Sequence, residues 1–290
     1  MSIPIDSQCL LCHFQRNLEL AQSLGDGEQV MDFARELMRM YLDAPADVGS
    51  PWFGPQTAQM FYDHFGLLID RYREEKLQSN QFVMERFSML QDRVASAPDP
   101  VYAGLQCSIL GNYLDFSALR GQVSFEKLEE MLQDALKMEL DRQVYASLCE
   151  DLKKGRKLLY LTDNAGEIGF DRIFAEEIAK AYPQLQITFC VRGGIAQNDA
   201  TREDAEAVGI PFPVIDNGNC VAGTQMDLLS EEAKQAFTEA DVILAKGMGN
   251  IETMYGCGYN VYYAFLVKCE KFIRLFDKPM FTPMLVKELK

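Results

Sequence analysis

The sequence is short of basic residues, of histidine and of long apolar runs. Among its 290 residues, 28 Lys and Arg stand against 43 Asp and Glu, which gives a formal net charge of -15. A surface this acidic repels the phosphates of nucleic acids and anionic lipids, so we expect neither as a general partner. A small anionic substrate still fits, provided that a cation and a few basic side chains reverse the potential locally.

Signals for membrane insertion and for export are also missing. No run of about 18 apolar residues is present, so no segment is expected to span a membrane. The N-terminal segment MSIPIDSQCLLCHFQRN lacks the basic region and the long apolar run of a signal peptide. The eight cysteines are spread over a long chain, unlike the dense cysteines of small secreted domains. We therefore expect a cytoplasmic protein with reduced thiols; the sequence carries no signal for an oligomeric state.

Several catalytic motifs are absent as well. No GxxxxGK[ST] sequence is present, which argues against a P-loop nucleotide hydrolase. The first predicted strand-to-helix turn reads DNAGEIG, so the GxGxxG fingerprint of dinucleotide binding is missing. Ala165 stands where haloacid-dehalogenase phosphatases carry their second aspartate. Both histidines, His13 and His64, lie in the first half of the chain, and we interpret each as a surface or core residue.

The hydrophobic pattern divides the chain into two halves. From about residue 6 to 150, apolar residues recur at spacings of three and four, which is typical of amphipathic helices. From Lys157 onward, short apolar runs alternate with helical stretches, which predicts βαβ units and a mainly parallel sheet covered on both faces. We expect an α/β protein with a helical N-terminal domain (1–153) packed on a Rossmann-like αβα domain (154–290). The predicted strands are KLLYLTD, QITFCVRG, PFPVID, DVILAKG and VYYAFLVKC.

Polar residues follow several of these strands, at the edge where parallel sheets bind their ligands. Each has an ordinary interpretation by itself: Asp-Asn after a strand is often a helix cap or an Asx-turn, and a lysine there is usually solvated. Their coincidence at several strand ends of one sheet favours a binding site. The residues are Asp163, Asn164 and Glu167 after the first strand, Arg192, Asn198 and Asp199 after the second, Lys246, Gly247 and Asn250 after DVILA, and Lys268 at the close of the last strand.

The chemistry of these residues predicts a hard-cation site beside a phosphate pocket. Mg²⁺ and Mn²⁺ prefer oxygen ligands and commonly take one or two carboxylates. Asp163, Asn164 and Asp199 supply such a set, while Lys246 and Lys268 would neutralise phosphate charge. Glycines at the strand ends allow the backbone to approach an anion closely.

Five motifs in one order resemble those of the damage-control phosphatases, the domain-of-unknown-function family 89. They are CLLC, GNYLDF, TDNAGE, NDATREDA and KGMGN. The resemblance covers nearly the whole chain and is strongest to the bacterial and archaeal branch that carries an N-terminal CxxC. It implies a helical region packed on a Rossmann-like domain and a divalent ion such as Mn²⁺, Mg²⁺, Co²⁺ or Ni²⁺. The family's metal ligands fall on Asp163, Asn164 and Asp199.

The resemblance also assigns residues around the ion. The family's lysine after the last apolar strand falls on Lys268, and its Gly-x-x-Asn loop falls on residues 247–250. Its Gly-Asn-x-x-Asp motif places Asn112 and Asp115 near the cleft. Met248 stands where the longer eukaryotic members have an Asp, so contacts made through that side chain are not expected here.

We therefore expect a metal-dependent phosphatase that hydrolyses small phosphate monoesters, such as sugar phosphates or damaged phosphometabolites, with a metal-activated water. Lys268, together with Lys246, would stabilise charge on the transferring phosphoryl group. Glu167 would orient water or substrate, and Arg192 and Asn198 are further candidates. Two alternatives stay open: a methyltransferase that uses S-adenosylmethionine, and a non-catalytic protein that binds a phosphometabolite.

The CxxC pair, Cys9 and Cys12, does not fit either role directly. Neither a second CxxC nor a His pair completes a zinc site, and a redox pair is the other option. We expect a structural or regulatory role for this pair rather than a part in hydrolysis.

Overall fold

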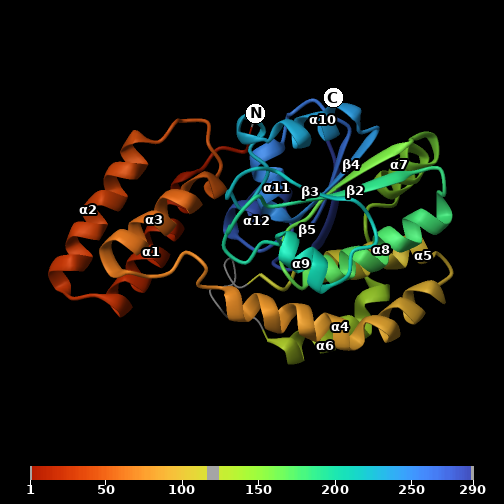
Figure 1. The fold of residues 1–290 in the computed structure, drawn as a ribbon, viewed down its shortest axis with the longest axis horizontal. Coiled ribbons are helices and arrows are strands. Elements are labelled where there is room, and N and C mark those ends of the chain that lie inside the picture. Colours follow the sequence, from red (N-terminus) through yellow and green to blue (C-terminus); the bar gives the residue numbers. More distant parts are fainter. Residues whose placement is uncertain (1, 116–123, 289–290) are drawn as a thin grey trace.

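Helices fill the first half of the chain in the computed structural model, which describes residues 2–115 and 124–288 (Figure 1). Phe116, the last residue of the GNYLDF motif, lies outside these ranges. Two breaks lie within this helical half: Gly66, with φ +64°, ends α3, and the 3₁₀ helix Ala135–Lys137 follows α6. The helices are α1 Ser7–Leu24, α2 Gly27–Asp43, α3 Phe53–Phe65, α4 Arg73–Ala95, α5 Pro100–Gly111, α6 Phe125–Asp134 and α7 Arg142–Lys154.

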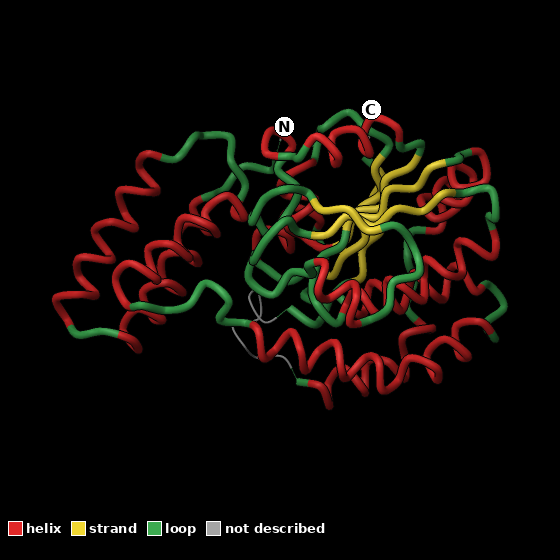
Figure 2. The backbone as a smooth tube through the Cα atoms, in the orientation of Figure 1, coloured by secondary structure: helices red, strands yellow, loops and turns green. Residues whose placement is uncertain are grey.

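Six strands form one sheet in the order β3-β2-β1-β4-β5-β6 (Figure 2). The first five pair in parallel and coincide with the five predicted strands, which confirms the α/β fold. The antiparallel edge strand β6 was not predicted, because its run is short and begins with a proline. Lys268 therefore closes the last parallel strand and not the last strand of the sheet. The strands are β1 Lys157–Leu161, β2 Gln186–Val191, β3 Val214–Asp216, β4 Val242–Lys246, β5 Val261–Leu266 and β6 Pro283–Lys287.

Helices cover both faces of the sheet, as the strands that are apolar on both sides predicted. Successive residues of β1 show this: Leu158 and Tyr160 join the core that α4, α5, α7 and α8 form, whereas Leu159 and Leu161 join the core on the α10 and α11 face. Figure 1 shows α4, α5 and α8 below the strands and α10 above them. The helices of the second half are α8 Glu167–Ala181, α9 Arg202–Ala207, α10 Glu231–Glu239, α11 Gly247–Met254 and α12 Glu270–Phe276.

Helices α1 to α3 stand beside the sheet and have a small core of their own, which includes Phe33, Leu37 and Phe61 (Figure 1). Helices α4 to α7 instead contribute to the large core on one sheet face. That core runs across the boundary expected after residue 153, so buried packing does not mark the boundary. All eight cysteines are free thiols. Among the described helices, none combines the length and the hydropathy needed to cross a membrane.

Candidate active site

Two loops at the carboxyl edge of the sheet are joined through their backbones. Asn164, just after β1, forms an isolated antiparallel bridge with Asp199, which follows β2. The Ala200 N–H donates to the Asp163 carbonyl oxygen at 2.7 Å. The bridge explains how Asp163, Asn164 and Asp199, which are distant in sequence, come together.

The pair Asp163-Asn164 does not cap the helix that follows it. The N-cap of α8 is Gly166, with φ +75° and no side-chain cap. The Gly166 N–H donates instead to the side-chain oxygen of Asn80 at 2.7 Å. At the start of α9, by contrast, Thr201 forms a capping box with Asp204. The ordinary interpretation of Asp163-Asn164 as a helix cap is therefore wrong.

Each of the two aspartates keeps one carboxyl oxygen without a hydrogen bond from the residues that the structure describes. Oδ2 of Asp163 accepts from the side-chain amides of Asn112 and Asn164, both at 2.8 Å, while its Oδ1 lies 3.6 Å from Nη2 of Arg192. Oδ2 of Asp199 accepts from Nε of Arg192 at 2.6 Å. Both aspartates line one pocket. The two Oδ1 atoms are therefore the oxygens left over for a ligand.

Burial shifts the ionisation of both aspartates. Burial raises the pKa of Asp163 well above its ordinary value, and the charges of Asp199 and Glu167 raise it further. Burial also raises the pKa of Asp199 to about 6, although the neighbouring Arg192 guanidinium opposes this shift. A bound cation would reverse both shifts, because it favours the charged carboxylates.

A fully buried ionic layer lies behind Asp163. The Lys246 ammonium donates to Glu167 at 2.8 Å and to Asp171 at 2.6 Å, and none of the three side chains is exposed. Burial disfavours the charge on Lys246, but the two carboxylates outweigh this and raise its pKa. Oε2 of Glu167 accepts from the side chains of Asn112 (2.9 Å) and Asn164 (2.8 Å). The layer thus orients the two asparagines that hold Asp163, and neither Lys246 nor Glu167 lines the pocket.

Arg192 is held by a second buried group. Its Nη1 donates to Oδ1 of Asn250 at 3.2 Å, and the Thr224 hydroxyl donates to the same oxygen at 2.8 Å. Asn250 in turn donates to the Thr162 carbonyl at 3.1 Å, at the end of β1. Nη2 of Arg192 is buried and has no hydrogen-bond acceptor among the described residues; Oδ1 of Asp163 lies 3.6 Å from it. Asn250 therefore helps to hold Arg192, and Arg192 in turn fixes the position of the Asp199 carboxylate.

Lys268 reaches the pocket from the loop after β5. Its ammonium donates to Oδ2 of Asp115 at 2.5 Å and to the Asn112 carbonyl at 2.8 Å. Burial disfavours its charge, but Asp115, Asp163 and Glu167 together raise its pKa, so it stays protonated at neutral pH. Lys268 and Asp115 both line the pocket, as expected. Both lysines at strand ends are buried, so the ordinary interpretation of such lysines as solvated is wrong here.

Helix α11 begins directly against Asp163. Gly247 has φ +77°, and a Cβ atom added there would lie 1.9 Å from Oδ2 of Asp163. Met248 and Gly249, in the first turn of α11, line the pocket. A helix N-terminus presents N–H groups and a partial positive charge, which suits an anion.

The pocket, called the site pocket below, has a volume of about 510 Å³. Five carboxyl groups line it against three cationic side chains, so an anionic ligand needs an additional cation to bind there. Sequence reasoning missed one wall, which α1 provides. The CxxC motif was the one signal from that helix, but periodicity alone does not place it. The missed lining residues are Gln8, Cys9, Cys12, His13, Arg16, Ser50, Pro51, Gln197, Ala222, Glu252, Cys269, Glu270, Lys271, Met280 and Phe281.

His13 and the cysteines of α1 also line this pocket. Burial lowers the pKa of His13 to about 3, and the ring is hydrogen-bonded to Tyr41 and Asn17. Of the two interpretations given for His13, surface or core residue, its burial favours the second. Cys12 is exposed, whereas burial raises the pKa of the half-buried Cys9 to about 12.

The donor set fits a hard divalent cation. Over residues 2–115 and 124–288, no group of three or more His, Cys, Asp or Glu side chains is arranged to hold a metal ion. The candidate set consists instead of two carboxylates and the amide oxygen of Asn164, which already accepts one hydrogen bond from Asn198 at 2.8 Å. Mg²⁺ and Mn²⁺ accept such sparse protein ligation, because water and substrate oxygens complete their coordination.

The chain is similar in sequence and in fold to known proteins. Residues 5–281 match the family model described as the damage-control phosphatase ARMT1-like domain. A damage-control phosphatase of Archaeoglobus fulgidus is 33% identical over 211 residues, which are 71% of each chain. A damage-control phosphatase of Pyrococcus horikoshii is 29% identical over 260 residues, 86% of each chain. A crystal structure of a DUF89 family protein from Pyrococcus horikoshii has a TM-score of 0.81 at 26% identity and covers 99% of both chains. The chain therefore belongs to the damage-control phosphatase family.

Proposed function

We propose that this chain is a metal-dependent phosphatase that hydrolyses small phosphate monoesters in the site pocket. The observation that supports this most directly is the meeting of Asp163, Asn164, Asp199 and Lys268 around one hollow. Two open carboxyl oxygens beside a buried ammonium suit a cation and a phosphoryl group that share oxygens. Two relatives of the chain are named damage-control phosphatases, which supports a phosphatase activity.

Each of the site residues has its own role in this proposal. Asp163, Asn164 and Asp199 would hold the divalent cation, which supplies polarisation of a phosphoryl oxygen and activation of a water molecule when bound. Lys268 would stabilise the negative charge of the transferring phosphoryl group, because its ammonium is held at the pocket by Asp115 and the Asn112 carbonyl. The N–H groups at the start of α11 would bind a further phosphoryl oxygen.

The remaining expected site residues take supporting roles in this proposal. Glu167 and Lys246 orient Asn112 and Asn164, and Arg192 orients Asp199. Direct contact of Lys246 or Glu167 with substrate is disfavoured, because both side chains are fully buried outside the pocket lining.

The test is phosphate release from p-nitrophenyl phosphate with added Mn²⁺ or Co²⁺. Asp163→Asn should lower kcat/KM by at least about 100-fold, because it removes a charged ligand from the cation. Asp32→Asn, at an exposed position on α2, is the matched control and should retain activity. Calorimetry with Mn²⁺ alone should detect binding to the wild type and not to Asp199→Asn. Activity that survives both EDTA and Asp163→Ala would refute the proposal.

The two alternatives predict different results. A methyltransferase must bind S-adenosylmethionine, which normally contacts the turn after the first strand. Here that turn is packed against α4, where Asn80 accepts the Gly166 N–H, so calorimetry should show no binding of this cofactor. A non-catalytic binding protein would give a saturating thermal shift with a phosphate ester but no release of phosphate.

A further inference from the structure

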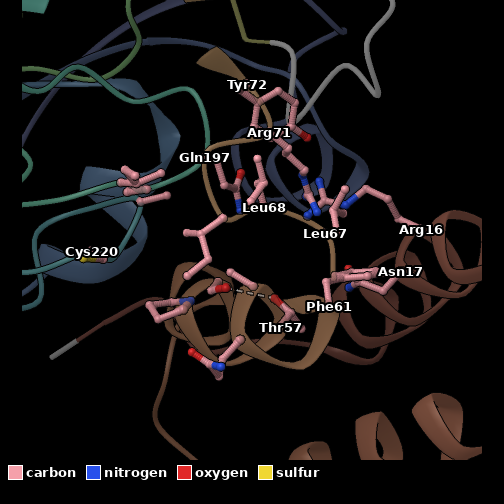
Figure 3. Close-up of a pocket in the computed structure, with 18 residues that line it drawn as sticks. Arg16, Asn17, Thr57, Phe61, Leu67, Leu68, Arg71, Tyr72, Gln197 and Cys220 are labelled. Atoms are coloured by element: carbon pink, nitrogen blue, oxygen red, sulfur yellow. Dashed lines mark hydrogen bonds between the residues drawn. The ribbon is translucent and has the colours of Figure 1, made fainter. Parts of the chain in front are cut away.

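A second hollow of about 370 Å³ opens beside the site pocket (Figure 3). We call it the side pocket, and it is lined by α1, α3, the segment 67–72 and two loops of the α/β part, 195–197 and 220–222. In Figure 3, Arg16 and Asn17 enter from α1, while Leu67, Leu68 and Arg71 come from the segment after α3. The side pocket thus lies between the three-helix unit and the sheet edge.

The two pockets have a common border. Arg16, Gln197 and Ala222 line both of them. The turn 195–199 runs from one to the other, because Ile195 lines the side pocket, Gln197 lines both, and Asp199 lines the site pocket. Gln197 has φ +55°, a left-handed conformation that is uncommon for a residue other than glycine. A molecule bound at Asp199 would therefore lie next to the side pocket.

The walls of the side pocket are apolar and exposed. Leu68 is 67% exposed, and Ile69 and Ile195 are 41% and 37% exposed. Large apolar side chains that share one hollow next to a candidate active site are suited to cover an apolar ligand group. Burying these surfaces would stabilise the complex by roughly 25 cal/mol for each Å² removed from water.

Two arginines also line the side pocket, Arg16 and Arg71. The Arg71 guanidinium lies 5.5 Å from the centre of the Phe61 ring and 5.0 Å from that of the Tyr72 ring. No carboxylate among the described residues pairs with Arg71. Arg16 lines the same hollow from α1. Two guanidinium groups in one hollow contrast with a chain whose net charge is -15, and they suit a ligand that carries a carboxylate or a second phosphate.

From these observations we propose that the side pocket binds the alcohol portion of the phosphate ester, and that it selects an apolar or aromatic group bearing an additional anionic group. The phosphoryl group would lie against Asp163, Asp199 and Lys268, and the alcohol portion would pass Gln197 toward Leu68 and Arg71. The proposal rests on the proposed phosphatase function and narrows its substrate class from sugar phosphates to larger, partly apolar esters.

The test compares ethyl phosphate, benzyl phosphate and 4-carboxybenzyl phosphate, all esters of primary alcohols, so that differences in kcat/KM report binding of the alcohol portion. The kcat/KM of the wild type should rise from ethyl phosphate to benzyl phosphate and from benzyl phosphate to 4-carboxybenzyl phosphate. Leu68→Asp should lower the ratio of benzyl to ethyl phosphate by roughly tenfold, as for other losses of apolar pocket contacts. Arg71→Gln should lower the ratio of 4-carboxybenzyl to benzyl phosphate by about fivefold, within the range of a partly exposed ion pair.

Matched controls lie on α2, away from both pockets. Leu42→Asp, at an 83% exposed position, and Arg35→Gln should leave both ratios unchanged. Unchanged ratios in the Leu68 and Arg71 variants, with p-nitrophenyl phosphate still hydrolysed, would overturn the side-pocket proposal and leave the phosphatase standing.

A binding measurement, which needs no turnover, tests the side pocket independently of the proposed hydrolysis. Calorimetry should show that 4-carboxybenzylphosphonate binds the wild type more tightly than ethylphosphonate, and that Arg71→Gln reduces this preference. If the preference holds but no ester is hydrolysed with any added metal, the side pocket is supported and hydrolysis is refuted. Equal binding of the two phosphonates overturns the side pocket.

Discussion

Replacement of Gly247 by alanine tests how closely the backbone of α11 must approach the candidate metal ligand. The Cβ atom of alanine would lie 1.9 Å from Oδ2 and 2.6 Å from Oδ1 of Asp163, so the carboxyl group has to move. Gly247 also has φ +77°, which an L side chain adopts with strain. The substitution is small, and it changes no charge.

Two costs follow from this geometry. The left-handed backbone costs alanine about 1 kcal/mol relative to glycine. Displacing Asp163 also breaks its buried hydrogen bonds from Asn112 and Asn164, each at 2.8 Å, and an unsatisfied buried group costs about 1–3 kcal/mol. We therefore expect Gly247→Ala to lower the free energy of unfolding by roughly 2–4 kcal/mol and to abolish Mn²⁺ binding.

A matched control separates the backbone strain of a left-handed alanine from the clash of its Cβ atom with Asp163. Gly66 has φ +64°, and a Cβ atom there would meet nothing within 4 Å, so Gly66→Ala should cost only the backbone term. Urea unfolding followed by circular dichroism gives both free energies, and calorimetry gives Mn²⁺ affinity. If Gly247→Ala is no less stable than Gly66→Ala and still binds Mn²⁺, the close approach to Asp163 has been interpreted wrongly.

Three further predictions concern groups around the site pocket. Burial lowers the pKa of His13 from 6.5 to about 3, so the unfolded chain binds a proton that the fold does not, and stability should fall as pH drops from about 6.5 toward 3. His13→Gln should flatten this slope in urea unfolding, whereas His64→Gln should keep it. Peptide mapping after brief iodoacetamide treatment should find Cys12 alkylated before Cys9, because Cys12 is exposed and burial raises the pKa of Cys9 to about 12. Lys246→Met should lower the free energy of unfolding by about 3–5 kcal/mol in urea, since it leaves two buried carboxyl groups unpaired; a loss below 1 kcal/mol would contradict the ionic layer.

Hydrophobic period and the rules of parallel sheets were sufficient to predict the strands β1 to β5 and the edge at which Asp163 and Asp199 meet. Sequence alone also suggested Lys268, from its place at a strand end, and Asp115, through the motif resemblance, as neighbours of that edge. It did not distinguish Lys268, which lines the pocket, from Lys246, which lies behind it. Lys246 ends β4 and Lys268 lies two residues beyond β5, and only packing against α5 and α8 decides where each ammonium lies.

The wall that α1 provides was not predictable in the same way. Helical period tells which residues of α1 share a face, but it does not tell what that face meets when the helix belongs to a separate core. The side pocket depends on the placement of the 195–199 turn against the segment 67–72, a contact between segments far apart in the chain. Such contacts follow from tertiary packing and produce no periodic pattern in the sequence.

The separate core of α1 to α3 has a consequence for how this enzyme family can diversify. Phe33, Leu37 and Phe61 pack with one another and not with the strands that carry Asp163 and Asp199. Substitutions in the three-helix unit can therefore reshape the two pockets while the sheet edge at Asp163 and Asp199 keeps its own supports. Under the proposed function, new leaving-group preferences would arise through changes in α1, α3 and the segment 67–72, at little cost to the stability of the sheet.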